Sequence, residues 1–122
     1  MLSKLFGKKG GIDKVFIIPF HVKALESSIM PSNTDGAYVS CYVKGETYVE
    51  ATESALKKLA EDGLHPEEIL QPIHEMPATE WLAHINEQWK DYVSNLPSQE
   101  EFESNISSGK VVYGPFGSYN SE

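Results

Sequence analysis

The stretch from Ala37 to Met76 constrains the fold most, because a strand, a helix and a second strand can be traced along it. In its first part, small or aliphatic side chains alternate with polar or aromatic ones, the period-two pattern of a half-buried strand. Thr47, followed three residues later by Glu50, matches a capping box and predicts a helix start. Apolar residues then recur at steps of three and four up to Gly63, which can close a helix in the left-handed conformation. An extended segment follows, so this stretch predicts a β-α-β crossover with two parallel strands in one sheet.

Two further strands are predicted, one on either side of this unit. Val15 to Lys23 is rich in β-branched and aromatic residues, and Pro19 within it suggests an edge strand or a bulge, because proline cannot donate a ladder hydrogen bond. Lys110 to Phe116 predicts the last strand. The polar segment 24–36 is long for a hairpin loop. Two interpretations of it stay open, a functional loop or a length that the fold tolerates.

A second and a third helix are predicted after Met76. Pro77 suits the first turn of a helix, and apolar residues follow at helical spacing until Pro97 ends the run. This stripe consists of Trp81, Leu82, Ile85, Trp89, Tyr92, Val93 and Leu96. Its two tryptophans are assigned to the core. Ser98 and Glu101 form another capping box, which predicts a short third helix that Gly109 closes.

Together these elements predict one α+β domain. We expect a mixed sheet of about four strands with a β-α-β crossover, two main helices packed on one face and a short third helix. The domain is expected to span residues 12–122 and to follow a flexible or peripheral N-terminal segment, residues 1–11. Met1 to Lys9 mixes apolar residues with lysines. It predicts either a weak contact with a membrane surface or a frayed terminus.

Charge is the most informative part of the composition. All ten basic residues are lysines, and they face eighteen acids. From Val15 to Glu122 there are six lysines and seventeen acids, a net charge of −11. The chain contains no arginine, so it lacks the planar fork that grips phosphate in two places. The charge argues against nucleic-acid, nucleotide or other anionic ligands and favours a basic protein partner, although acidity can also serve solubility alone.

The cysteine content and the N-terminus point to a reducing compartment. Cys41 is the single cysteine and cannot form an internal disulfide bond. No apolar leader follows Met1, and no apolar run is long enough to span a bilayer. A cytoplasmic location is therefore expected.

The sequence contains no complete catalytic, metal-binding or cofactor-binding motif, so no enzyme, no metal site and no cofactor are predicted. His74 and Glu75 resemble the start of a zinc-protease motif, but Ala78 stands where that motif needs its second histidine. Cys41 falls on the apolar side of its strand, where a buried thiol is expected rather than an activated thiolate. The glycines form no phosphate-binding loop.

Acidic residues gather at two places where they could steer a basic partner. One group brackets the turn after the first predicted helix, and the other lies at the start of the third. The two groups are Glu61, Asp62, Glu67 and Glu68, and Glu100, Glu101 and Glu103. Each group predicts either a partner-binding surface, which would speed association with a basic protein, or an ordinary solvated face.

In size, charge and element order, the chain resembles the small acidic immunity proteins of bacterial toxin systems. The resemblance implies a protein that neutralises a cognate basic toxin domain through its acidic surface. Two alternatives remain open. One is a small ligand-binding or enzymatic domain, with His74, Glu75 and Tyr42 lining a pocket on the sheet. The other is a homodimeric structural or regulatory protein that pairs through edge strands.

Overall fold

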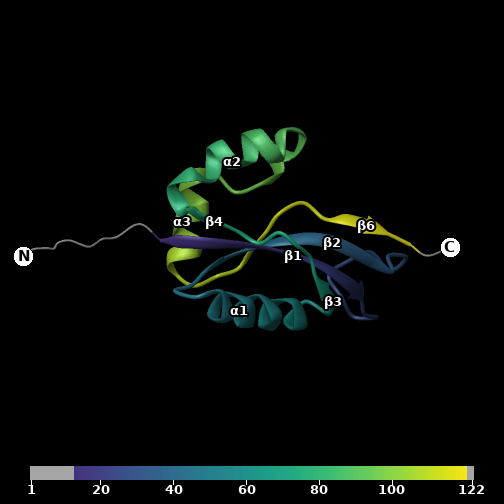
Figure 1. The fold of residues 1–122 in the computed structure, drawn as a ribbon. Coiled ribbons are helices and arrows are strands. Elements are labelled where there is room, and N and C mark those ends of the chain that lie inside the picture. The colour runs from purple at the N-terminus through teal and green to yellow at the C-terminus, as the bar shows by residue number, and fades with distance from the viewer. Residues whose placement is uncertain (1–12, 121–122) are drawn as a thin grey trace, which may run out of the picture.

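The computed structural model describes residues 13–120. The N-terminal segment 1–11 and the membrane contact predicted for Met1 to Lys9 lie outside these residues. The described chain forms an antiparallel sheet between two layers of helices, which confirms the α+β class (Figure 1). None of its helices has the length and apolar character that crossing a bilayer requires.

Within residues 13–120 the sheet has six strands, and each pairing between them is antiparallel. The strands are β1 (Lys14–Ala24), β2 (Gly36–Lys44), β3 (Leu64–Ile69), β4 (His74–Pro77), β5 (Val112–Tyr113) and β6 (Gly117–Tyr119). β1 and β2 pair along almost their whole length and form the centre. β3 and β4 share the other edge of β1, and β5 and β6 share the outer edge of β2. The structure therefore differs from the predicted mixed sheet of about four strands.

The position of β1 explains this difference. Helix α1 (Tyr48–Glu61) does connect β2 to β3, but β1 pairs with both of these strands and lies between them. Of the two alternatives predicted for Val15 to Lys23, the edge position is wrong, whereas the pairing of β1 with β3 does shift register between His21 and Val22. Pro19 is tolerated in a central strand because its side of β1 faces the junction between β3 and β4, where the Pro19 carbonyl accepts a hydrogen bond from the Leu70 N–H (2.8 Å). The missing N–H points to the same junction, since both groups of one residue project to the same side of a strand.

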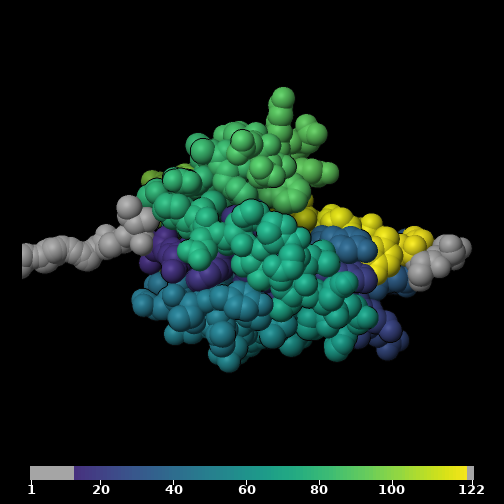
Figure 2. Space-filling model, in the orientation of Figure 1, coloured from purple at the N-terminus to yellow at the C-terminus, as the bar shows by residue number. Residues whose placement is uncertain are grey.

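Helices cover both faces of the sheet, so the expectation of two main helices on one face is wrong. α1 covers one face, and α2 (Trp81–Gln88) and α3 (Gln99–Ser107) cover part of the other (Figures 1 and 2). The reason is visible in β1, where four successive residues from Val15 to Ile18 are buried. Their side chains alternate between the two faces, and a strand that is apolar on both faces needs cover on both.

The core consists of two clusters separated by the sheet. Under α1, the helix residues Ala51, Ala55 and Leu59 pack against the even-numbered residues of β1. On the opposite face, Trp81 and Phe102 stack with their ring centroids 4.0 Å apart and pack over Val15, Ile17 and Tyr42.

The second predicted helix is shorter than its apolar stripe. A 3-10 turn, η1 (Ala78–Glu80), leads into α2, and Trp89 then leaves helical geometry with φ −127° and ψ 41°. A second 3-10 segment, η2 (Lys90–Asn95), follows. Trp81 and Ile85 are buried as predicted, whereas Leu82 and Tyr92 of the same stripe are exposed.

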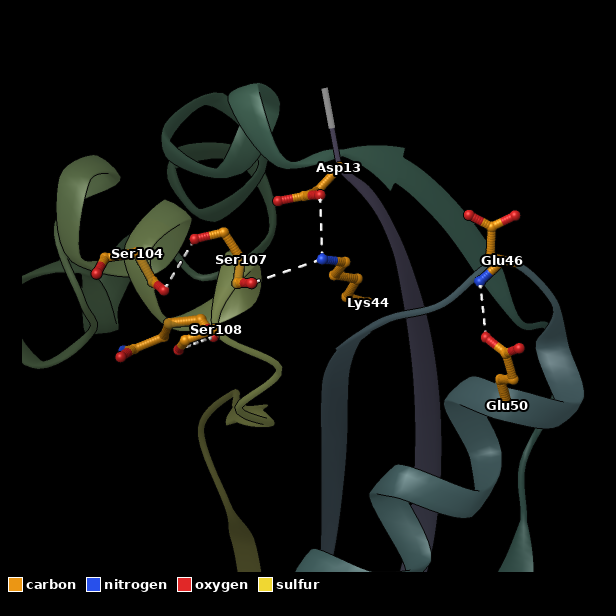
Figure 3. A network of polar contacts seen from close by, with 8 residues as sticks. Asp13, Lys44, Glu46, Glu50, Ser104, Ser107 and Ser108 are labelled. Carbon is orange, nitrogen blue, oxygen red and sulfur yellow. Dashed lines mark hydrogen bonds and ion pairs between the residues drawn. The ribbon is translucent and has the colours of Figure 1, made fainter. Parts of the chain in front are cut away.

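The helix ends agree closely with their sequence signals. Ser98 and Glu101 form the complete predicted capping box, and Gly63 takes the predicted left-handed conformation with φ +73°. At α1, the Thr47 hydroxyl accepts from the Glu50 N–H, but the Glu50 carboxylate accepts from the Glu46 N–H instead of completing the box (Figure 3).

Contacts beyond the sheet hold both ends of β1 and β2 in place. At one end, Lys44 lies 3.6 Å from the Asp13 carboxylate and donates to the Ser107 carbonyl (Figure 3). At the other end, the 24–36 loop docks on the end of α1. Its Leu25 N–H donates to the Gly63 carbonyl (2.9 Å), and its Ile29 N–H donates to the Asp62 carbonyl (3.0 Å). The loop therefore has a structural role.

Candidate functional site

A cleft of about 510 Å³ lies between α2, β4 and the sheet. It exists because α2 ends before it has covered the whole second face of β1 and β2. The floor of the cleft is formed by Ile17, Pro19, Ser40 and Tyr42. Glu80, His84 and Glu87 line it from the α2 side, where their spacing of four and three residues places them on one side of the helix.

A hydrogen-bond network ties the floor of this cleft to its wall. The Tyr42 side chain is fully buried, and its hydroxyl lies 2.7 Å from His84 Nε2. Trp89 Nε1 donates to the same hydroxyl over 2.9 Å. Because an indole N–H can only donate, the Tyr42 oxygen is the acceptor of that bond, and its own proton is available to His84. His84 Nε2 accepts this proton in the neutral tautomer that carries its hydrogen on Nδ1.

Burial sets the protonation of both partners. Burial raises the pKa of Tyr42 to about 12, against a smaller lowering by the hydrogen bond from Trp89. Burial also lowers the pKa of His84, and this effect outweighs the opposing influence of the Glu87 carboxylate, while His74 lowers it further. A neutral tyrosine therefore donates to a neutral histidine at pH 7.

This protonation state predicts that the free energy of unfolding falls below pH 7 in a His84-dependent way. As the pH drops through 6.5, the ordinary pKa of histidine, the unfolded chain takes up a proton that the folded chain binds only at lower pH. The unfolded state is then favoured. Urea unfolding from about pH 7.5 to about pH 5 should show a steeper loss of stability for the parent chain than for His84→Gln. Parallel profiles for the two proteins would contradict the assignment.

The charged groups of the cleft are mostly acidic. Glu75, Glu80 and Glu87 line it, and within the described part of the chain its lining includes no lysine. The Glu75 carboxylate belongs to the opposite face of the sheet, because its register partner Phe16 packs under α1, and it lies 3.7 Å from Lys14 Nζ. With the half-buried ring of Trp89 in the same lining, the cleft suits a cationic group, which both carboxylates and aromatic faces attract.

The structure brings together the three residues predicted to line a pocket. Tyr42, His74 and Glu75 come from β2 and β4, which pair with opposite sides of β1, and all three line this cleft. Tyr42 lies in its floor, whereas His74 and Glu75 are exposed.

The first predicted acidic group is partly engaged in the fold. Asp62 accepts a hydrogen bond from the Tyr113 hydroxyl (2.6 Å) and lies 3.3 Å from Lys58 Nζ. Glu67 lies 3.7 Å from His65 Nε2. The side chains of this group that are exposed to solvent belong to Glu61, Glu67 and Glu68.

The second predicted acidic group also takes part in hydrogen bonds that stabilise the fold. Glu101 completes the capping box of α3, and Glu103 accepts a hydrogen bond from Gln99, while Glu100 is exposed. The two groups lie near opposite ends of β1. The first group lies at the C-terminal end of α1, where the Gly63 carbonyl accepts from the Leu25 N–H just after β1. The second group lies at the start of α3, where Gln99 donates to the Ala78 carbonyl, and the Ala78 N–H donates to the Asp13 carbonyl just before β1. They do not form one surface.

Glu80, His84, Glu87 and Trp89 are the site residues that sequence analysis missed. The helical spacing of Glu80, His84 and Glu87 was present in the sequence as a polar stripe beside the apolar one. That stripe identifies a common side of the helix but does not reveal that the side faces an uncovered part of the sheet.

Other reactive side chains are in inert settings. Cys41 is fully buried, and burial raises the pKa of its thiol to about 12, so it is protonated at neutral pH. Within residues 13–120, no group of three or more histidine, cysteine or acidic side chains is placed to hold a metal ion.

No protein-family model, curated protein or solved structure matches this chain.

Proposed function

We propose that this chain is a binding protein that blocks a basic protein domain, as an immunity protein blocks its toxin. We further propose that the cleft beside α2 receives a cationic side chain of that partner. The observation that carries this proposal is the lining of the cleft, where Glu80, Glu87 and the ring of Trp89 border a common space, and the described lining includes no lysine. A lysine or arginine side chain satisfies both the charge and the aromatic surface.

The charge of the rest of the chain supports the same partner. Seventeen acids against six lysines from Val15 to Glu122 create a negative field that accelerates encounter with a basic surface. The exposed carboxylates of Glu61, Glu67, Glu68 and Glu100 contribute to this attraction. The proposal includes a cytoplasmic location, in keeping with a protonated free thiol at Cys41.

The protonation of the cleft favours binding over catalysis. Tyr42, with a pKa of about 12, is a weak acid at neutral pH, and its proton is directed to His84 Nε2. His84 Nε2, the nitrogen that would serve as a general base, therefore already accepts a hydrogen bond from Tyr42, and this bond joins α2 to the sheet.

The test compares capture of host proteins by the parent chain and by a cleft variant. Glu80→Gln with Glu87→Gln removes two charges from the cleft, and Glu46→Gln with Glu53→Gln removes two exposed charges at α1. We expect the parent and the α1 variant to retain the same basic protein at low salt and to release it at high salt. The cleft variant should bind it about tenfold more weakly. Capture of no basic protein, or equal affinity for all three forms, would refute the proposal.

A small ligand in the cleft is the second candidate function. Its volume of about 510 Å³ falls within the range of ordinary small-molecule sites. A fragment screen by NMR distinguishes the two, because a small-molecule site should give saturable shifts at Trp89 and His84 with millimolar fragments. A site for a protein side chain should respond to guanidinium and alkylammonium compounds alone.

A further inference from the structure

An exposed cluster of three rings lies on the uncovered half of the same sheet face. His21, Tyr38 and Tyr119 come from the neighbouring strands β1, β2 and β6. His21 and Tyr38 are cross-strand partners whose rings stack with centroids 4.7 Å apart and planes 17° from parallel. The Tyr119 hydroxyl lies 2.6 Å from His21 Nε2, and its ring centroid lies 5.9 Å from that of Tyr38.

These rings are held in place although they are exposed. The side chain of Tyr119 lies directly over Gly36, where an added Cβ would overlap the Tyr119 hydroxyl. Tyr38 is nevertheless 49% exposed and Tyr119 37% exposed. A fixed, exposed aromatic surface can bind a partner at a low cost in side-chain entropy.

The ring cluster and the cleft share one continuous face. Along β2, Tyr42, Ser40 and Tyr38 follow one another at steps of two and therefore point to the same side, as do Ile17, Pro19 and His21 along β1. Tyr38 is about 13 Å from Tyr42 along the strand, since each residue of a strand advances by roughly 3.3 Å. An extended peptide covers this distance with about four residues. Figures 1 and 2 show β6 (yellow) uncovered beside the α2–η2 region (green).

Charges around the rings favour a cation at the end that faces the cleft. Glu80 and Glu87 line the cleft on one side of the rings, and Glu68 is the register partner of His21 in β3. Lys23 lies at the far end of the face, opposite Gly36, and disfavours a cation there. A planar guanidinium can stack on a tyrosine ring and is weakly hydrated, so arginine suits such a surface better than lysine.

We propose that Tyr38, with His21 and Tyr119 packed around it, receives an arginine of an extended basic segment whose next cationic side chain enters the cleft. This inference rests on the proposed function, because both contacts serve the same basic partner. It identifies the recognised feature as two cationic side chains about four residues apart in an extended chain.

The test uses a fluorescein-labelled peptide with two arginines four residues apart in a glycine–serine background. Matched peptides carry two lysines or two glutamines. In fluorescence anisotropy at low salt, Tyr38→Ala should weaken binding of the arginine peptide about fivefold and that of the lysine peptide less. Tyr38→Phe keeps the ring and should bind within about twofold of the parent. The matched control is Tyr48→Ala, which removes a tyrosine 40% exposed on α1, on the opposite face, and should leave binding unchanged.

The outcomes separate this inference from the proposed function. If Glu80→Gln with Glu87→Gln weakens binding but a folded Tyr38→Ala does not, the ring contact is refuted while the proposed function stands. If the parent chain binds the arginine peptide no better than the glutamine peptide, both are refuted. If Tyr38→Ala weakens binding of the glutamine peptide equally, the rings form a general apolar contact and the arginine assignment is overturned.

Discussion

Replacing Trp81 with alanine is expected to lower the free energy of unfolding by about 3–5 kcal/mol, the cost typical of removing a large buried ring. The Trp81 side chain is fully buried and stacks on Phe102 with its ring plane only 2° from parallel. The edge of Tyr42 also contacts it, with ring centroids 5.0 Å apart. Its Nε1 donates to the Pro97 carbonyl over 2.8 Å, so the substitution also leaves that acceptor without its partner.

Urea unfolding followed by far-UV circular dichroism measures this loss without depending on tryptophan fluorescence. Leu82→Ala is the matched control, because Leu82 is the next residue of α2 and is 46% exposed. It should change stability by no more than about 0.5 kcal/mol. Equal losses for the two variants would show that the cluster under α2 contributes little to the fold.

Gly63→Ala is expected to be more destabilising than Gly109→Ala, although both glycines have positive φ. At Gly109 (φ +85°) no atom would contact an added Cβ, so alanine costs only the left-handed backbone conformation, about 1–2 kcal/mol. At Gly63 (φ +73°) the Cβ would meet Ser28 Cα at 2.6 Å and Ser28 N at 2.9 Å. Relieving that clash should add about 1–3 kcal/mol.

The clash at Gly63 cannot be relieved by a rotamer change, because the added Cβ would meet the backbone of Ser28 and not a flexible side chain. The same loop is fixed by the hydrogen bonds from Leu25 to Gly63 and from Ile29 to Asp62. Thermal unfolding of both variants beside the parent chain gives the comparison, with Gly109→Ala isolating the conformational cost. A Gly63→Ala protein as stable as Gly109→Ala would mean that the loop shifts freely on the end of α1.

Local signals predicted individual elements well. The alternation along β2, the capping box at Ser98 and the helix end at Gly63 each depend on residues within a few positions of one another. Sequence spacing fixes such short-range geometry directly. For the same reason the α+β class could be predicted.

The arrangement of the elements could not be predicted in the same way. Pro19 suggested an edge strand or a bulge, yet β1 can be central because Pro19 lies where the neighbouring strand changes from β3 to β4. That compensation involves Leu70, which is remote in sequence. The apolar run from Val15 to Ile18 is buried on both faces of the sheet, but the pairing of β1 with three other strands follows from tertiary packing.

The residues of the candidate site also fall into two groups, those that local sequence signals indicated and those that depend on tertiary structure. Tyr42, His74 and Glu75 could be proposed from the sequence because they fell in or beside predicted strands. His84 and Trp89 gained their roles from the interruption of α2, where Trp89 leaves the helix and donates to Tyr42. The sequence stripe had extended the helix through Trp89, so the gap that opens beside it could not be foreseen.

The burial of Cys41 gives the protein a built-in reporter of its own opening motions. Its thiol lies fully buried in the middle of β2, between β1 and β5, and is protonated at neutral pH. A thiol reagent can therefore modify the chain only when the two central strands separate or α1 lifts away. The rate of modification of the natural thiol measures how often the middle of the sheet opens locally, and no mutation is needed.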